Sequence, residues 1–391
     1  MIEGMSDSMP SYNKISAEIL RAIIDVVGKD MVITNHTDLE KYSHDETEDL
    51  SYYPEVVVTP GSAAEISKLL ILCNEHLIPV IPRGAGTGLS GGALAVMGGL
   101  LISMERFNNI IAIDEQNLQA MVEPGVITEE FMNAVATKGL YYPVDPASKG
   151  SCFIGGNVAH GAGGARVVKY GTIREYILNL EVVLPSGEII WTGANTLKYA
   201  SGYNLTQLMI GAEGTLGIIT KIVTKLIPLP TVNVLMLASF SSNESACEAV
   251  SAIFRAGVTP SAVEYMEREG IEWVKRYTNT VFKLDDADNA FLLIEVDGAD
   301  NDIIFKDCER INKVLEQHHC NEVLFADTAA QKTELWSIRS AIGEAVKQHA
   351  VYKKEDTVVP RAALPQLVKG IKAIGAKYGF ESVLLWACRR R

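Results

Sequence analysis

Glycine is concentrated in one short stretch near the start of this chain, and that stretch restricts what the chain can fold into more than any other feature. Residues 82–93 read PRGAGTGLSGGA and come directly after the apolar run 78–81. Glycine adopts backbone conformations that other residues avoid, and it leaves the backbone N–H groups uncovered. Successive N–H groups of this kind form concave sites for anions. The pattern therefore indicates a loop that closes around a diphosphate.

The segment after these glycines differs from the usual dinucleotide fingerprint. Gly86, Gly88 and Gly91 match G-x-G-x-x-G. The fingerprint also requires a helix that begins at this loop and an acidic residue about 20 positions later. Here the chain continues with ALAVMGG and then with residues 100–103, which read as another strand. We therefore expect the loop to close over its ligand between two strands, without opening a helix.

Two further glycine clusters occur in the same part of the chain. Residues 143–164 read PVDPASKGSCFIGGNVAHGAGG, and residues 210–220 read IGAEGTLGIIT and lead into a β-branched strand. Each glycine weakens regular structure by roughly 0.5–1 kcal/mol. Three glycine-rich loops are therefore hard to explain as turns alone, and they favour a binding function.

Composition limits the remaining possibilities. With 391 residues, of which 48% are hydrophobic, the chain is too long for one ordinary core and is expected to form two domains. A net charge of −13 disfavours nucleic acid as a partner. The six cysteines show no metal-type spacing, which favours reduced thiols in a cytoplasmic protein. We find no apolar run of about 18 residues and expect no transmembrane segment; peripheral attachment to the inner membrane stays an alternative.

The segment Pro228–Thr231, which contains two prolines, is the best candidate for the domain boundary and gives domains at 1–228 and 229–391. In the first domain short strands alternate with helices; Ser16 caps one expected helix, and Ser62 with Glu65 forms a capping box for another. In the second, strands and helices alternate as in an antiparallel sheet covered by helices. The expected strands there are 232–240, 260–266, 291–296 and 321–325, and the expected helices include 243–256 and 302–317.

Four ordered motifs carry a family resemblance: PRGAGTGLSGG, DPxS with IGGNVAxxAGG, YGxxRxYILxLEVVLPSGE and IGxEGTLGIIT. Together they resemble the FAD-linked oxidases of the vanillyl-alcohol oxidase superfamily, in the branch of the glycolate oxidase flavoprotein subunit and the D-lactate and D-2-hydroxyglutarate dehydrogenases. The resemblance implies an α+β fold. A PCMH-type FAD-binding domain of two subdomains would precede an α+β cap domain with an antiparallel sheet.

The resemblance also implies the FAD contacts. The expected pyrophosphate cradle is Arg83, Gly84, Ala85, Gly86, Thr87, Gly88, Ser90 and Gly91. The ribityl and phosphate region is expected at Ser148, Gly155, Gly156, Asn157 and Ala159, and Gly214 and Ile219 are expected on the adenine or ribityl side. Residues 83–93 contain no histidine, the residue that attaches FAD covalently in some relatives, so we expect non-covalent FAD. His160 reads equally as a flavin contact or as a loop histidine.

The expected cap supplies the substrate pocket. Arg339, in ELWSIRSAIGEA, matches a family arginine and can direct two N–H groups onto a carboxylate. Lys354 matches a family lysine near the hydroxy-acid head group, with Lys353 as the alternative. The implied reaction oxidises a D-2-hydroxy acid, such as glycolate or D-lactate, to the 2-oxo acid by hydride transfer to the flavin. An unidentified electron acceptor, with an iron–sulfur subunit as one candidate, would reoxidise the flavin. The alternative is a non-catalytic flavin-binding remnant or complex subunit.

The last residues depart from the family. Relatives continue with Gly-His-x-Gly-Asp-Gly-Asn-x-His, whose histidines bind a divalent metal, whereas this chain ends in VLLWACRRR and offers no metal ligand that we can assign. A single nucleotide inserted after the codon for Val383 accounts for this ending. The residues VLLWACRRR can be encoded by codons that, after removal of one base, encode Val-Cys-Tyr-Gly-His-Ala-Gly-Asp-Gly. We hypothesise that residues 384–391 are out of frame and that the chain is C-terminally truncated. The alternative is a genuine basic terminus for an anionic partner.

Overall fold

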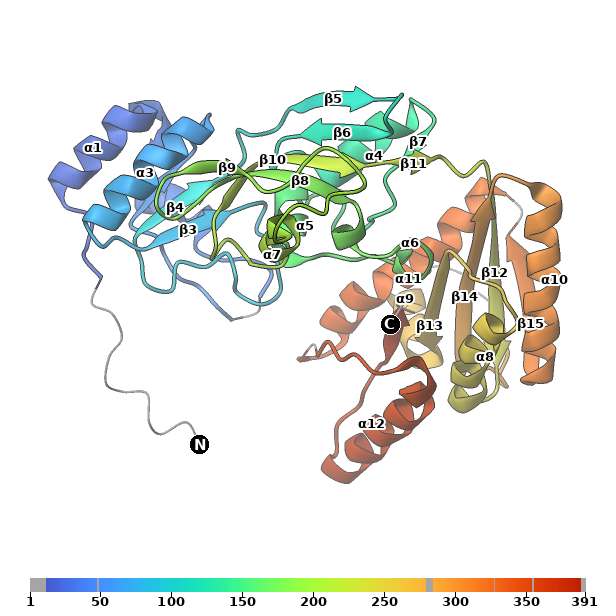
Figure 1. Cartoon of the computed structure of the whole chain (residues 1–391). Helices are drawn as coiled ribbons and strands as arrows, with labels where there is room; N and C mark the ends of the chain where they lie inside the picture. Colours follow the sequence, from blue (N-terminus) through green and yellow to red (C-terminus); the bar gives the residue numbers. More distant parts are fainter. Residues whose placement is uncertain (1–11, 48, 279–283, 327, 354, 388–391) are drawn as a thin grey trace. The chain divides into compact units, whose positions relative to one another are not determined.

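The computed structural model describes residues 12–47, 49–278, 284–326, 328–353 and 355–387. These residues form two compact units (Figure 1). Unit 1 runs to Ala162 and resumes over Thr172–Leu229; unit 2 contains Gly163–Gly171 and the chain from Pro230 onward. A short segment inside the first half of the sequence thus groups with the second half. The linear division at 228/229 stays a prediction.

The first part of unit 1 is a small sheet backed by two helices. Its strands β1 (Val32–Ile33), β2 (Val56–Val58), β3 (Val80–Arg83) and β4 (Leu100–Ser103) lie in the order β1-β2-β4-β3. Both β2 and β3 run parallel to β4, which lies between them. Helices α1 (Ala17–Val27) and α3 (Ala63–Glu75) bury their apolar faces against this sheet. Residues 84–99, all of which the structure describes, contain no helix, as the glycine spacing predicts.

The structure confirms Ser16 and Ser62 as the caps of these two helices, but the predicted capping box of Ser62 and Glu65 is only half formed. The Ser16 hydroxyl accepts a hydrogen bond from the Ile19 N–H, and α1 ends at Gly28, whose φ is 87°. The Ser62 hydroxyl accepts from the Glu65 N–H. The Glu65 carboxylate turns back to the N–H of Gly61, one residue before the position that a capping box uses. The entry into α3 is nevertheless fixed from both sides.

The second part of unit 1 is an antiparallel sheet in the order β5-β6-β10-β8-β9. Strands β8 (Ile177–Val183) and β9 (Ile189–Trp191) form the hairpin expected around Pro185-Ser186-Gly187. The other elements of this part are β5 (Ile110–Asp114), β6 (Gln119–Val122), α4 (Thr128–Ala136), β7 (Leu140–Tyr141), α5 (Ile154–His160), α7 (Leu205–Met209), β10 (Ile218–Lys225) and β11 (Ile227–Pro228).

Unit 2 is built on an antiparallel sheet in the order β15-β12-β14-β13-β16. Its strands are β12 (Val232–Phe240), β13 (Ala262–Glu267), β14 (Ala290–Gly298), β15 (Cys320–Ala326) and β16 (Leu385–Ala387). One face packs against α8 (Asn243–Arg255), α10 (Asn301–Gln317) and α12 (Leu364–Tyr378). The other face packs against α9 (Arg268–Thr278) and α11 (Ala329–His349). The short helix α6 (Val167–Tyr170) belongs to the segment that groups with this unit.

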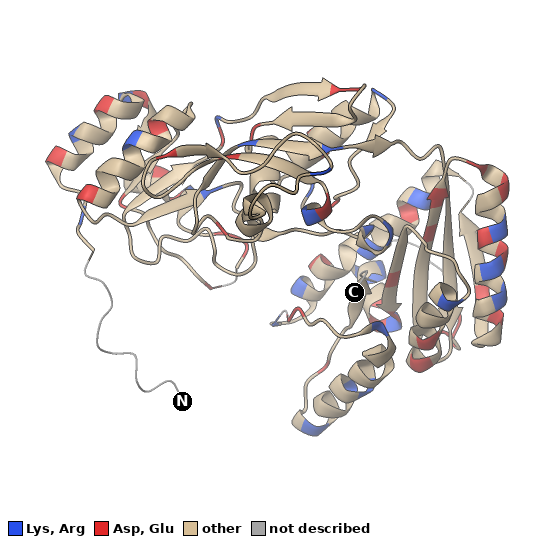
Figure 2. Ribbon diagram, in the orientation of Figure 1, with Lys and Arg blue, Asp and Glu red and all other residues tan. Residues whose placement is uncertain are grey.

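The predicted strands and helices of this half are therefore confirmed, and so is the α+β class. Acidic and basic residues both occur along α10 (Figure 2). Its buried residues Ile304, Cys308, Ile311, Val314 and Leu315 pack against the sheet. The described cysteines are free thiols: Cys73, Cys152, Cys247, Cys308 and Cys320. Burial raises the pKa of the Cys73 and Cys247 thiols to about 12, which keeps them protonated at neutral pH. Cys388 lies outside the described residues.

Candidate functional site

The three glycine-rich loops, far apart in sequence, meet in unit 1. A Cβ atom added to Gly84 in the first loop would lie 3.7 Å from the Cα of Gly156 in the second. A Cβ added to Gly214 in the third loop would overlap the ring of Pro82, and Gly214 has a φ of 76°. Only glycine fits such a position without strain. The loops therefore share one location, as expected for loops that hold a single ligand.

The first loop presents unused backbone donors. Among hydrogen bonds between described residues, none is donated by a backbone N–H of residues 84–90. The next donor, the N–H of Gly91, bonds the Thr47 hydroxyl at 2.7 Å. Within this run Gly86 has a φ of 73°, and a Cβ there would overlap the Arg83 guanidinium. Several uncovered N–H groups on one turn form the donor set that a phosphate requires.

Two adjacent glycines of the second loop, Gly155 and Gly156, have different surroundings. A Cβ on Gly155 would overlap Pro124, so this glycine is required for packing. A Cβ on its neighbour Gly156 would meet no atom within 4 Å. Gly156 nevertheless lies beside Gly84 of the first loop, at the start of α5. The space that a side chain would fill here is open and bordered by backbone, which fits a planar or phosphate-bearing cofactor.

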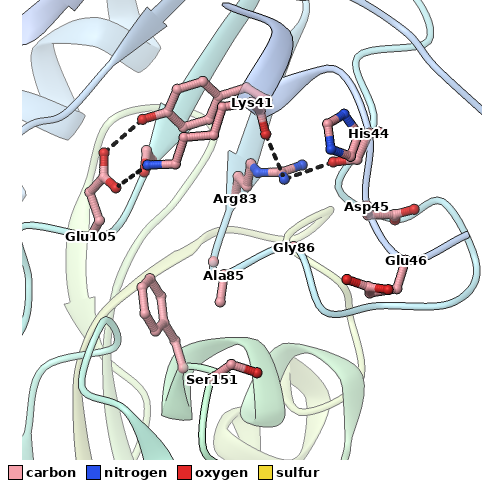
Figure 3. A pocket seen from close by; sticks show the side chains of 13 residues that line it. Lys41, His44, Asp45, Glu46, Arg83, Ala85, Gly86, Glu105 and Ser151 are labelled. Atoms are coloured by element: carbon pink, nitrogen blue, oxygen red, sulfur yellow. Dashed lines mark hydrogen bonds and ion pairs between the residues drawn. The ribbon is translucent and has the colours of Figure 1, made fainter. Parts of the chain in front are cut away.

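Two predicted cofactor residues use their side chains within the protein. The Arg83 guanidinium donates to the backbone oxygens of Lys41 and His44 at 3.4 and 2.8 Å (Figure 3). It also donates to the backbone oxygen of Ala93 at 3.4 Å. Burial lowers the pKa of Arg83. Its side chain thus fastens the segment before β2 to the first glycine loop.

Asn157 is the second case. Its side-chain amide donates to the Thr128 hydroxyl at 2.6 Å, and the residue is buried. The structure therefore gives Asn157 a role in joining α5 to α4. Only the side-chain amide oxygen or the backbone of Asn157 could then make the predicted contact with the ligand.

The other predicted cofactor residues lie around the same loops. Ala85 and Thr87 are half-buried, and Gly88 and Ser90 are exposed. The Ser148 carbonyl accepts hydrogen bonds from the N–H groups of Ser151 and Cys152. The Ala159 carbonyl accepts one from the Glu213 N–H at 2.9 Å. Ile219 is buried in β10, where it pairs with Val182 of β8. The His160 ring lies 3.3 Å from the Glu213 carboxylate and is mostly exposed.

The structure adds a pocket that the glycine pattern does not reveal. It has a volume of about 310 Å³ and lies against the first loop at Gly84–Gly86 (Figure 3). Its lining is Lys41, Tyr42, His44, Asp45, Glu46, Arg83, Gly84, Ala85, Gly86, Ser103, Glu105, Ser151 and Phe153. The run 41–46 reaches the pocket through its bonds to Arg83. The sequence signal for it is weak, because the run is polar but carries no spacing typical of a binding motif.

The candidate substrate residues belong to unit 2. Arg339 lies on α11, and its Nε donates to the carboxylate of Glu264 on β13 at 2.5 Å. One turn earlier on the same helix, the Trp336 indole N–H donates to Glu295 of β14 at 3.1 Å. Lys354 lies outside the described residues. Its neighbour Lys353 is exposed and pairs with Glu355 at 2.8 Å, so the structure does not bring Lys353 to the sheet.

Comparison with known families matches both halves of the chain. Residues 54–193 match the FAD binding domain family, and residues 229–386 match the C-terminal domain of FAD linked oxidases. The chain is 37% identical over 365 residues to the glycolate oxidase subunit GlcD of Bacillus subtilis, covering 93% of this chain and 77% of that protein. It is 35% identical to a D-lactate dehydrogenase of Anaerostipes hadrus, covering 95% and 79%.

Solved structures support the same fold. An alkyldihydroxyacetonephosphate synthase superposes with a TM-score of 0.77 at 20% identity, over 95% of this chain and 77% of the other. A 4-ethylphenol oxidase from Gulosibacter chungangensis also gives a TM-score of 0.77, at 18% identity, over 98% and 83%. At these identities the likeness concerns the fold.

Fold and glycine loops together define an FAD-dependent oxidoreductase with a PCMH-type FAD-binding domain. Within that class, the chain belongs to the family of FAD-linked oxidases that includes the GlcD and D-lactate dehydrogenase relatives. The resemblance seen in the sequence is confirmed. In the part of the chain that the structure describes, no helix combines the length and apolar character needed to cross a bilayer.

Proposed function

We propose that this chain binds FAD non-covalently in unit 1 and oxidises a D-2-hydroxy acid to the 2-oxo acid. The observation that carries the proposal is the cradle of uncovered N–H groups at residues 84–90 beside the open backbone of Gly156. The names of several relatives, glycolate oxidase subunit, D-lactate dehydrogenase and D-2-hydroxyglutarate dehydrogenase, share 2-hydroxy-acid chemistry. Bound FAD would supply the acceptor of the hydride.

The cofactor would be held mainly by backbone. Residues 84–88 and Ser90 would donate N–H groups to the pyrophosphate, and Gly156 would leave room for its approach. The Gly91 N–H is bonded to the Thr47 hydroxyl, so Gly91 would shape the loop rather than donate. Arg83 would act indirectly, since its guanidinium fixes the loop to the carbonyls of Lys41 and His44. Residues 83–93 contain no histidine, so we infer that no covalent flavin link forms there.

Arg339 would bind the substrate carboxylate. Its Nε is already bonded to Glu264, which holds the plane of the guanidinium. To the described residues, the two terminal nitrogens of Arg339 donate no hydrogen bond. They can therefore form the paired N–H contacts that a carboxylate prefers. Lys354 is proposed as a second contact to the hydroxy-acid head group.

The divalent metal that the family resemblance implies does not fit the described residues. They contain no group of three or more His, Cys, Asp or Glu side chains placed to hold a metal ion. No step is therefore assigned to a metal here. For the reoxidation of the flavin we propose a separate protein acceptor, with an iron–sulfur subunit as one candidate, because the GlcD relatives are named as subunits. We place the reaction in the cytoplasm.

The direct test is an anaerobic absorbance spectrum of the purified, FAD-loaded chain during addition of D-lactate, glycolate or D-2-hydroxyglutarate. The proposal expects the oxidised flavin band to bleach with at least one of these acids. A flavin band that persists with all three would contradict the catalytic proposal and would support a flavin-binding remnant.

The substrate assignment is tested in the same assay by Arg339→Lys, with Arg310→Lys as the control. Arg310 is an exposed arginine on α10 that pairs with Asp307. Because lysine cannot reproduce the paired contact, we expect the KM of Arg339→Lys to rise about 10- to 100-fold with FAD content unchanged. An unchanged KM would refute the role of Arg339.

A further inference from the structure

One buried carboxylate in unit 2 is shared by the segment 163–171 and by helix α11, which carries Arg339. Glu295 of β14 is 2% exposed. Its oxygens accept hydrogen bonds from the Arg166 guanidinium at 2.9 to 3.1 Å and from the Trp336 indole N–H at 3.1 Å. The Ser261 hydroxyl lies 3.4 Å away. Glu295 thus joins the segment 163–171 to helix α11.

Both partners of Glu295 have informative places in the sequence. Arg166 comes shortly after Gly163 and Gly164, the end of the second glycine loop. Trp336 precedes Arg339 by three residues on α11, so the two side chains lie on the same face of the helix. A single carboxylate therefore contacts the chain leaving the proposed cofactor loop and the helix that carries the proposed substrate arginine.

The neighbouring strand holds the same helix face. Ala262 of β13 is in register with Glu295, so Glu264, two residues further along, projects from the same face of the sheet. Glu264 accepts the hydrogen bond from Arg339. Helix α11 is thus fixed at two positions one turn apart, by Glu295 through Trp336 and by Glu264 through Arg339.

The segment 163–171 is also held at a second position. Asp297, two residues after Glu295 on β14, accepts hydrogen bonds from the Lys169 ammonium at 2.5 Å and from the Tyr170 hydroxyl at 2.8 Å. Asp297 is 5% exposed. A buried carboxylate is tolerated only when it is paired and hydrogen-bonded. Glu295 meets this condition, because its carboxylate accepts hydrogen bonds from the Arg166 guanidinium and from the Trp336 indole N–H.

We propose that Glu295 is a positioning residue: through Trp336 it sets the orientation of Arg339, and through Arg166 it ties that orientation to the chain leaving the second glycine loop. This inference rests on the proposed function of Arg339. It adds a residue that acts on substrate binding through Trp336 and Arg166, without contacting the substrate itself.

The test is Glu295→Gln, which keeps the shape and the acceptor for Trp336 but removes the charge that pairs with Arg166. We expect the KM for the D-2-hydroxy acid to rise about tenfold, while kcat and FAD content stay within about twofold of the wild type. Asp307→Asn, which removes a carboxylate from α10, the helix that covers the opposite face of the sheet, is the matched control and should leave KM unchanged.

A second variant separates positioning from loss of folding. Trp336→Phe keeps an aromatic ring at this position and removes the N–H donor to Glu295 together with part of the ring area beneath the Arg166 guanidinium, so its KM should also rise. Both changes affect the same Glu295–Trp336 contact. In free-energy terms, the increase in KM of the double variant should therefore be smaller than the sum of the increases in the two single variants. Additive effects, or an unchanged KM in FAD-loaded Glu295→Gln and Trp336→Phe, would overturn the inference. If Arg339→Lys also left KM unchanged, the proposed substrate role of Arg339 would fail instead, and absence of flavin bleaching with all three acids would contradict the proposed function itself.

Discussion

Adjacent glycines in α5 show how one residue type serves two purposes. Gly155 is required because Pro124 occupies the place of a side chain, whereas Gly156 borders open space beside Gly84. The sequence GG predicts a glycine-dependent loop, but it cannot separate these two roles. The distinction depends on Pro124 and Gly84, which lie far away in the sequence.

This difference leads to opposite predictions for two neighbouring substitutions. Gly156→Ala should leave the apo protein folded, because a Cβ meets nothing in the protein, but weaken FAD binding at least about tenfold by filling the cofactor space. Gly155→Ala should destabilise the apo protein by about 1–3 kcal/mol through overlap with Pro124. Thermal unfolding of the apo proteins and FAD fluorescence titrations would measure both effects.

Gly370→Ala in α12, where a Cβ also meets nothing, is the control: FAD affinity should stay unchanged, and stability should rise by about 0.5–1 kcal/mol because alanine favours the helix. Wild-type FAD affinity in Gly156→Ala would exclude this glycine from the cofactor site. Arg83 and Asn157 could be predicted from the sequence as site residues. The hydrogen bonds that their side chains donate within the protein could not be predicted. Their partners, the His44 carbonyl and the Thr128 hydroxyl, carry no sequence signal for that contact.

At the scale of elements, helix ends were the most predictable features. Ser16, Ser62 and Gly28 mark the ends of α1 and the start of α3 because caps are local interactions. Strand order was less accessible. The sequence shows β2, α3 and β3 in succession, yet β4 inserts between β2 and β3. That pairing depends on contacts across the glycine loop and leaves no periodic signal.

The cap of α3 yields a test. Ser62→Ala removes the acceptor for the Glu65 N–H and should lower the stability of unit 1 by about 1 kcal/mol. Ser186→Ala is the matched control, because that hydroxyl lies in an exposed turn and bonds only the Glu188 side chain. Denaturant unfolding followed by circular dichroism measures both. Equal stability of the two variants would show that the Ser62 cap contributes nothing measurable.

At the scale of the whole molecule, the sequence predicted two α+β halves but not the membership of residues 163–171. These residues are surrounded in sequence by unit 1, and their grouping with unit 2 depends on the buried carboxylates Glu295 and Asp297. Carboxylates at strand positions read as solvent-facing charges, so only the folded sheet reveals their partners. The chain passes between the units at 162/163, 171/172 and 229/230.

The most direct test of the proposed cofactor site is a titration of FAD into the purified apo protein, with acid precipitation of the saturated complex. We predict saturable binding of one FAD per chain and release of intact FAD into the supernatant. The loaded protein should also have a higher thermal midpoint, with about 2.7 kcal/mol of stabilisation when free FAD is 100 times its Kd. Absence of binding, or flavin that stays with the precipitated chain, would contradict the non-covalent glycine-loop site on which the proposed reaction depends.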